Sequence, residues 1–128
     1  MSQLSSPVRF SSTHLWVRVE GEFAILGLSE YLSDQMGEII RLDLPDLGDA
    51  IRARRHMGHV ESEEASAPID APISGEVVEV NAEALDNPDL LNSDPLGAGW
   101  LLRVRIEDKS ELDDLISEEE YAELTTEP

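Results

Sequence analysis

Nucleophilic side chains are scarce in this sequence. Eight of the nine basic residues are arginine, and Lys109 is the only lysine. Amide formation with an activated acyl group needs a nucleophilic amine, so that chemistry has one side-chain candidate. The absence of cysteine excludes disulfides, thiolate metal ligands and a cysteine nucleophile. Serine, histidine and aspartate are present, but no Gly-x-Ser-x-Gly elbow or phosphate-binding loop joins them. We therefore expect no catalytic residue and no enzyme activity.

Histidines and glutamates lie close together between residues 56 and 64, which raises the question of a metal site. On a regular strand, His56 and His59 point to opposite faces. No third ligand is fixed by spacing, although Glu61 is near. Glu61, Glu63 and Glu64 lack the glycine-centred loop of a dedicated Ca²⁺ site. We expect no metal site here.

Composition narrows the class of protein. The 128 residues fit one domain, and 28 acidic against 9 basic residues give a formal charge of −19. Such an acidic chain lacks the clustered cations that bind nucleic acid or an anionic membrane. No apolar run reaches the length of a membrane span, and the N-terminus has no signal or transit pattern. We expect a cytoplasmic monomer.

The elements that must position these residues are mostly strands. Apolar and β-branched residues with turn signals between them predict strands at 15–19, 23–28, 39–44, 58–61, 75–80 and 100–106. Ser29 and Gly37 are suited to begin and end a short helix over 30–36. The segment 87–95 is too rich in turn formers to predict a regular element.

Two segments of similar sequence, GEIIRL at 37–42 and GEVVEV at 75–80, are 38 residues apart. They predict two matching halves of one small sandwich, each covering the apolar face of the other. Coincidence is the alternative, because the string is short.

The C-terminal segment 107–128 is denser in acid than the body, with ten acidic residues and Lys109. Capping boxes at Ser110 and Ser117 indicate helix starts. Leu112, Leu115 and Ile116 share one helical face, and Tyr121 and Leu124 extend it after a break at Ser117. We expect a core over about 8–106 and a solvated acidic helical segment packed on it.

Ordered motifs along the chain point to one family. They are GHVESEEASAPIDAPISGEVVEVN at 58–81, HLWVRVEG at 14–21, LPDLGD at 44–49, NP at 87–88, NSDP at 92–95, GAGWLL at 97–102, SELD at 110–113 and EEY at 119–121. Together they resemble the glycine cleavage system H protein over about residues 8–124, and agreement of several motifs in order is specific.

The resemblance implies a mainly β, lipoyl-domain-type barrel-sandwich hybrid with short helices. In that family a lysine at a β-hairpin tip carries lipoate in amide linkage. The arm collects an aminomethyl group from glycine decarboxylase, presents it to the aminomethyltransferase and is reoxidised by dihydrolipoamide dehydrogenase. The protein itself is a carrier, and catalysis belongs to these partners.

The sequence departs from the family pattern at the hairpin tip, Ser62 to Ala65. Counting back from Gly75 without a gap places the attachment position at Glu64. The preceding residue, usually apolar, is Glu63, and the acid expected four residues later is Pro68. The family's flanking Glu61 and Gly75 are retained.

A carboxylate cannot form the lipoyl amide, so we expect no bound lipoate and no working aminomethyl carrier. We expect instead a non-catalytic interaction module that docks on glycine cleavage enzymes or lipoate-handling enzymes. The acidic tip is either an idle soluble loop or a surface for a partner that offers Arg or Lys. Two alternatives remain: a carrier modified elsewhere, with Lys109 as the substitute amine, and a small-molecule or metal binder that reuses the fold.

Overall fold

The structure, a computed structural model, describes residues 8–125. The strands are β1 (Val8–Phe10), β2 (Leu15–Glu20), β3 (Phe23–Leu28), β4 (Ile39–Asp43), β5 (Ala50–Ile51), β6 (His56–Ser62), β7 (Ser66–Asp70), β8 (Gly75–Val80), β9 (Leu102–Ile106) and β10 (Ile116–Ser117). The helices are α1 (Glu30–Met36), α2 (Ala82–Asp86), α3 (Leu90–Ser93), α4 (Glu118–Thr125) and a 3-10 helix at Lys109–Asp114.

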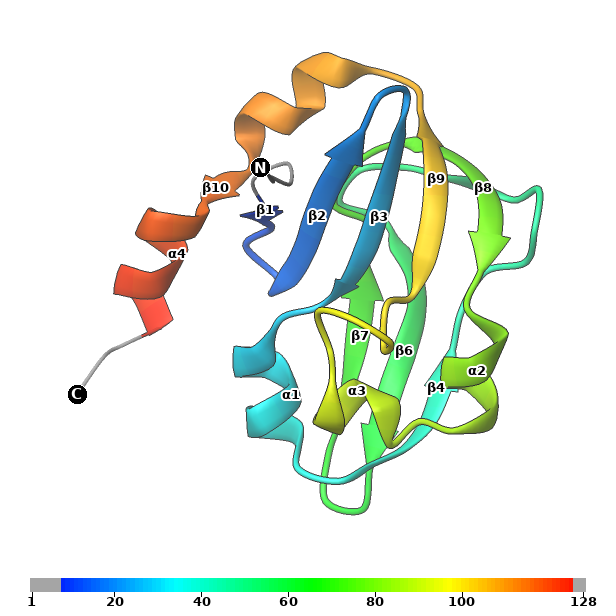
Figure 1. The fold of residues 1–128 in the computed structure, drawn as a ribbon, viewed down its shortest axis with the longest axis vertical. Helices are drawn as coiled ribbons and strands as arrows, with labels where there is room; N and C mark the ends of the chain where they lie inside the picture. The colour runs from blue at the N-terminus through cyan, green and yellow to red at the C-terminus, as the bar shows by residue number, and fades with distance from the viewer. Residues whose placement is uncertain (1–7, 126–128) are drawn as a thin grey trace.

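Two antiparallel sheets form the body of the molecule (Figure 1). The larger has the order β10-β1-β2-β3-β9-β8-β5, and the smaller has the order β4-β6-β7. Short helices lie around their edges and ends. The mainly β fold expected from the sequence is confirmed.

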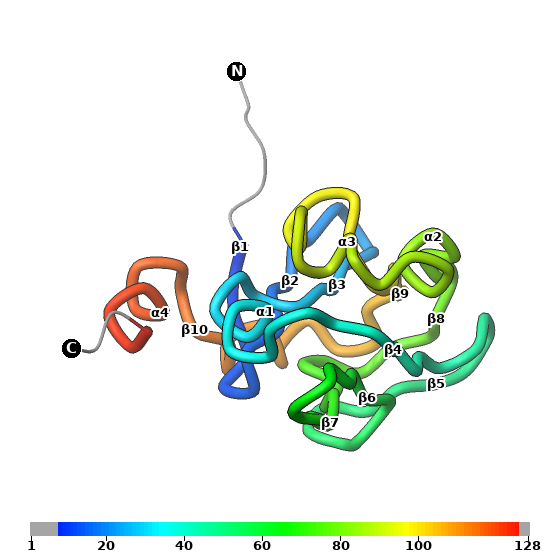
Figure 2. Tube along the Cα trace, turned by 90° about the horizontal axis from the view of Figure 1, so that it is seen from below, coloured from blue at the N-terminus to red at the C-terminus, as the bar shows by residue number. Residues whose placement is uncertain are grey.

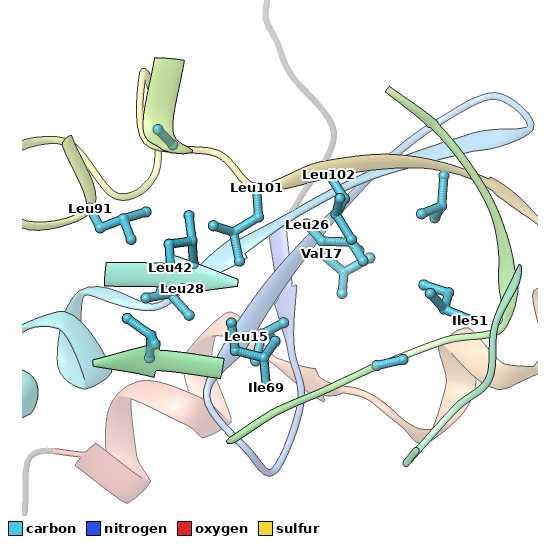
Figure 3. Packing of buried hydrophobic residues seen from close by; sticks show 14 of the residues in the cluster. Leu15, Val17, Leu26, Leu28, Leu42, Ile51, Ile69, Leu91, Leu101 and Leu102 are labelled. Atoms are coloured by element: carbon cyan, nitrogen blue, oxygen red, sulfur yellow. The ribbon is translucent and has the colours of Figure 1, made fainter. Parts of the chain in front are cut away.

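The core lies between the inner faces of the two sheets (Figure 3). Alternate residues of the central strands enter it, because side chains along a strand point to opposite faces. Leucine, isoleucine and valine fill it, with Leu15, Leu26, Ile69, Ile73 and Leu102 among the fully buried residues. Aliphatic packing of this kind is what the low aromatic content requires.

The local predictions for the first third of the chain are confirmed. β2 and β3 pair antiparallel across Gly21, whose φ of 65° suits a tight turn. Ser29 caps α1 by accepting a hydrogen bond from the Leu32 N–H at 3.1 Å. α1 ends at Gly37, which has a φ of 77°. The connection to β4 therefore begins at Gly37.

The two similar segments, 37–42 and 75–80, contribute strands to different sheets. β4 lies in the three-stranded sheet and β8 in the seven-stranded sheet. Leu42 and Val77 are buried in the same core. This is the arrangement predicted for two halves of a sandwich.

Several elements differ from the sequence-based expectation. Strands β1, β5, β7 and β10 and helix α2 were not predicted, and α3 lies within the 87–95 segment expected to be irregular. All of these elements are two to five residues long, too short to show a period.

The C-terminal segment is not one helical face. The 3-10 helix ends at Asp114, and Ile116 enters β10, which pairs with β1. The 3-10 helix is capped by Asp108, whose carboxylate accepts the Ser110 N–H at 3.0 Å, rather than by Ser110. The Ser117 box is confirmed, since its hydroxyl accepts the Glu120 N–H at 3.2 Å.

A second apolar cluster holds this segment to the body. Tyr121 stacks on Phe10 with ring centroids 4.0 Å apart, and Trp16 completes the buried set. The Trp16 Nε1 donates to the Pro95 carbonyl at 2.9 Å. α4 lies on the β1–β10 side, away from α2 (Figure 2). None of the helices within residues 8–125 is long and apolar enough to cross a membrane.

Candidate functional site

The turn between β6 and β7 displays two side chains to solvent. The Ser62 N–H donates to the Ala65 carbonyl at 2.8 Å, and the Ala65 N–H donates to the Ser62 hydroxyl at 3.2 Å. These bonds close a tight turn with Glu63 and Glu64 at its two central positions. Ser62 is buried, while Glu63, Glu64 and Ala65 are exposed. The turn therefore exposes the side chains of residues 63 and 64 to solvent.

The flanks of the turn hold it in a fixed register. Glu61 lies opposite Ser66 across the hairpin and opposite Arg41 of β4 on its other side. Pro68 lies opposite His59, on a strand whose outer edge is unpaired, where a missing N–H is tolerated. The predicted tip and two of its flanking residues, Glu61 and Pro68, thus lie on one hairpin.

Gly75, the distal flank, starts β8 on the other sheet. A Cβ at this position would collide with the backbone carbonyl of Arg105 on β9. Glycine is required here by close approach of two strands, which is a packing reason.

A cleft of about 390 Å³ lies between the tip and the end of α1. Its acidic members are Asp34 and Glu38 from the α1 end, and Glu63 and Glu64 from the tip. The remaining lining residues are uncharged: Gln35, Met36, Gly37 and Ser62. Like charges within a Debye length repel, so this mouth disfavours an anionic group and favours a cationic one.

The only lysine is far from the tip. Lys109 begins the 3-10 helix, drawn orange at the top of Figure 1, and the β6–β7 turn lies at the bottom. Lys109 is exposed, but it is on a short helical turn and not on a hairpin. Nothing in its surroundings resembles the geometry of the tip.

The two histidines of β6 lie closer than a regular strand allows. The register of β6 against β7 shifts between His56 and Gly58, and the extra residue cancels the alternation of faces. The His56 and His59 ring centroids are 6.5 Å apart, so the expectation of opposite faces was wrong. His59 Nε2 lies 3.2 Å from an Asp43 carboxylate oxygen. Within residues 8–125, no group of three His, Cys, Asp or Glu is placed to hold a metal.

A polar contact between the C-terminal helix and the start of α1 was not predicted from the sequence. The Tyr121 hydroxyl donates to the Ser29 hydroxyl at 2.7 Å, and His14 Nδ1 lies 2.7 Å from the same Tyr121 oxygen. Burial raises the pKa of Tyr121 and lowers that of His14. Both shifts keep the pair neutral. The partners are 92 and 107 residues apart, so no local pattern signals the contact.

Comparison with known proteins decides the family. The family model described as "Glycine cleavage H-protein" matches residues 8–128. The chain belongs to the glycine cleavage H-protein family. It is 40% identical to the glycine cleavage system H protein of Carboxydothermus hydrogenoformans over 127 residues, covering 99% of this chain and 98% of that one. It is 43% identical to a probable H protein of Haloarcula marismortui over 114 residues, 89% and 90% of the two chains.

The fold agrees with a solved H-protein structure. The crystal structure of a glycine cleavage system H protein from Mycobacterium marinum superposes with a TM-score of 0.84 at 27% identity, covering 97% of this chain and all of that one. The expected barrel-sandwich hybrid with short helices is confirmed. H proteins act as carriers and not as catalysts, in keeping with the expectation of a non-enzyme.

The residues at the tip do not fit the family's prosthetic group. The hairpin has a tight exposed turn, but the side chains it presents are Glu63 and Glu64. A carboxylate has no N–H to acylate, so the lipoyl amide cannot form at either residue.

Proposed function

We propose that this H-protein family member is not lipoylated and does not carry the aminomethyl group. One observation carries the proposal: an intact, exposed hairpin tip has Glu64 at the position where the family's pattern has its attachment lysine. The substitution is not isolated, because Glu63 and Pro68 depart from the pattern as well.

Its proposed role is non-catalytic docking on enzymes of glycine cleavage or of lipoate handling. Support comes from a fold that is retained over nearly the whole chain, with the departure centred on the tip. The hairpin register and the Ser62 turn are also intact, which supports a remaining role for this surface. The proposed partners are glycine decarboxylase, aminomethyltransferase, dihydrolipoamide dehydrogenase and lipoate ligases.

Intact mass after co-expression with an active lipoate ligase and lipoate tests the first half. We expect the mass of the unmodified chain. The matched comparison is the triple variant Glu63→Val, Glu64→Lys, Pro68→Asp, which restores the family pattern and is expected to gain one lipoyl group. A lipoyl group on the wild-type chain would overturn the proposal, and its loss in Lys109→Arg would establish modification at that lysine.

Binding to each purified partner enzyme, measured by biolayer interferometry, tests the second half. Docking predicts saturable binding to at least one of them by the unmodified chain. Lack of binding to all of them would remove the docking role and leave the result on lipoylation unaffected.

A further inference from the structure

The outer face of the seven-stranded sheet has three arginines around an apolar centre. Arg18 of β2, Ile25 of β3 and Arg103 of β9 lie directly opposite one another across the strands. Phe23 and Arg105 are paired in the same way two residues along. Their neighbours in each strand enter the core, so these five side chains point outward. In Figure 1 no helix crosses β2, β3 and β9.

The arginines are held in place by aromatic rings. The Arg103 and Arg105 guanidinium carbons lie 4.7 Å and 5.4 Å from the Phe23 ring centroid. The Arg18 guanidinium lies 5.1 Å from the ring centroid of Trp16, which is fully buried. A guanidinium stacked on a ring keeps its N–H edges free to donate, and stacking lowers the entropy lost on binding.

Most of this positive charge has no ion-pair partner in the part of the chain that the structure describes. Arg103 lies 3.8 Å from Glu79 of β8, and no ion pair links Arg18 or Arg105 to a carboxylate within residues 8–125. Glu76 and Glu79 of β8 lie directly opposite Arg105 and Arg103, and Glu20 of β2 lies directly opposite Phe23. The arginines therefore surround Phe23 and Ile25, and the acids lie beyond them on β2 and β8.

Arg103 also has an unsatisfied donor. Its Nε is the single buried side-chain nitrogen or oxygen without a hydrogen-bond partner in the described part of the chain. A buried donor without a partner costs free energy, and such groups in native proteins call for an explanation. Because Nε itself is buried, a carboxylate that approaches from solvent meets the terminal nitrogens of this guanidinium, whose side chain is 38% exposed.

We propose that this face, defined as Arg18, Phe23, Ile25, Arg103 and Arg105, docks a protein partner through carboxylates set around an apolar contact. Arginine and aromatic residues at the centre of a patch are the composition of binding hot spots. A second copy of this chain is the less favoured occupant, because two molecules of charge −19 repel at long range. The proposal is independent of the hairpin tip.

The test is an amide NMR titration of the full chain with a short synthetic peptide that mixes glutamate and leucine. A peptide with glutamine in place of every glutamate is the ligand control. We expect saturable shifts on β2, β3 and β9 that weaken as salt is raised. Arg103→Glu with Arg105→Glu is expected to weaken binding about tenfold, since two favourable pairs become repulsive.

The matched control is Arg52→Glu with Arg55→Glu, the same charge change at two exposed arginines of the β5–β6 loop. We expect the peptide to bind this variant with a Kd within about twofold of the wild-type value, because the changed charges lie away from the sheet face and are screened by salt. If the sheet-face variant loses its dispersed spectrum, Arg103→Gln with Arg105→Gln replaces it. Absence of shifts, shifts centred on the 52–55 loop, or equal binding by the glutamine peptide would overturn the proposal. Sedimentation showing self-association that Arg103→Glu with Arg105→Glu abolishes would assign the face to a second copy and also overturn it.

Discussion

Tyr121 fastens the C-terminal helix, and removing its hydroxyl measures how much that contact contributes. Tyr121→Phe keeps the ring that stacks on Phe10 at 4.0 Å and removes the bonds to Ser29 and His14, each 2.7 Å long. A hydrogen bond contributes about 0.5–1.5 kcal/mol net, so losing two costs about 1–3 kcal/mol. Ser29 stays buried and His14 stays half-buried after each has lost a partner, which places the loss toward the upper end.

Two measurements separate a global from a local effect. Urea unfolding gives the change in the free energy of unfolding, and amide exchange reports the opening of α4 and β10 by themselves. We expect faster exchange in both elements and at the start of α1, which Ser29 caps. Exchange that speeds up without a change in the urea midpoint would mean that the segment opens before the core does.

Leu124→Ala is the matched control on the same helix. Leu124 is 61% exposed, whereas Tyr121 is 6% exposed. An exposed substitution away from such contacts is expected to stay within about 0.5 kcal/mol. If Tyr121→Phe matches Leu124→Ala in both measurements, the hydroxyl contacts do not fasten the segment and the reasoning fails.

Three further predictions concern stability. Burial holds the pKa of His14 below its ordinary 6.5, so the unfolded chain binds that proton more tightly. Neutral His14 therefore contributes fully to the free energy of unfolding above pH 6.5, and this contribution decreases as the pH falls toward the folded-state pKa. His14→Asn removes the titrating group, and asparagine tolerates the φ of 71° at this position. We expect the variant to show a flatter dependence of urea stability on pH in this range. Gly27→Ala places a Cβ 2.5 Å from the Trp16 indole and should cost about 1–3 kcal/mol, seen as a lower Tm and altered tryptophan fluorescence. Ser117→Ala removes the α4 cap and should cost about 1 kcal/mol, measured by amide exchange of that helix; unchanged exchange would count against the capping box.

The elements predicted correctly are those whose signals are local. β3 and β8 have apolar and β-branched runs long enough to read, and α1 has a serine cap and a glycine stop. These features depend on residues within one turn or one strand of each other. Residue 64, identified by counting along the chain, lies at an exposed turn, and its correspondence to the family's attachment position stays a prediction.

The errors came from long-range contacts. Ile116 was assigned to a helical face, but pairing with Phe10 draws it into β10. A register shift in β6 brought the His56 and His59 rings to one side. In each case the deciding partner lies on another strand, and a single sequence carries no record of which strand that is.

The sequence alone determined which reactive side chains this protein has. It contains one lysine, no cysteine, and a carboxylate at the position where the family pattern has its attachment lysine. These are covalent facts that folding cannot alter. Tertiary structure decided which groups meet. It set Asp34 and Glu38 beside the acidic tip, joined Tyr121 to Ser29, and lined up Arg18, Ile25 and Arg103 across three strands. Such neighbours are fixed by strand order and register, which follow from burying a common core rather than from any local stretch of chain.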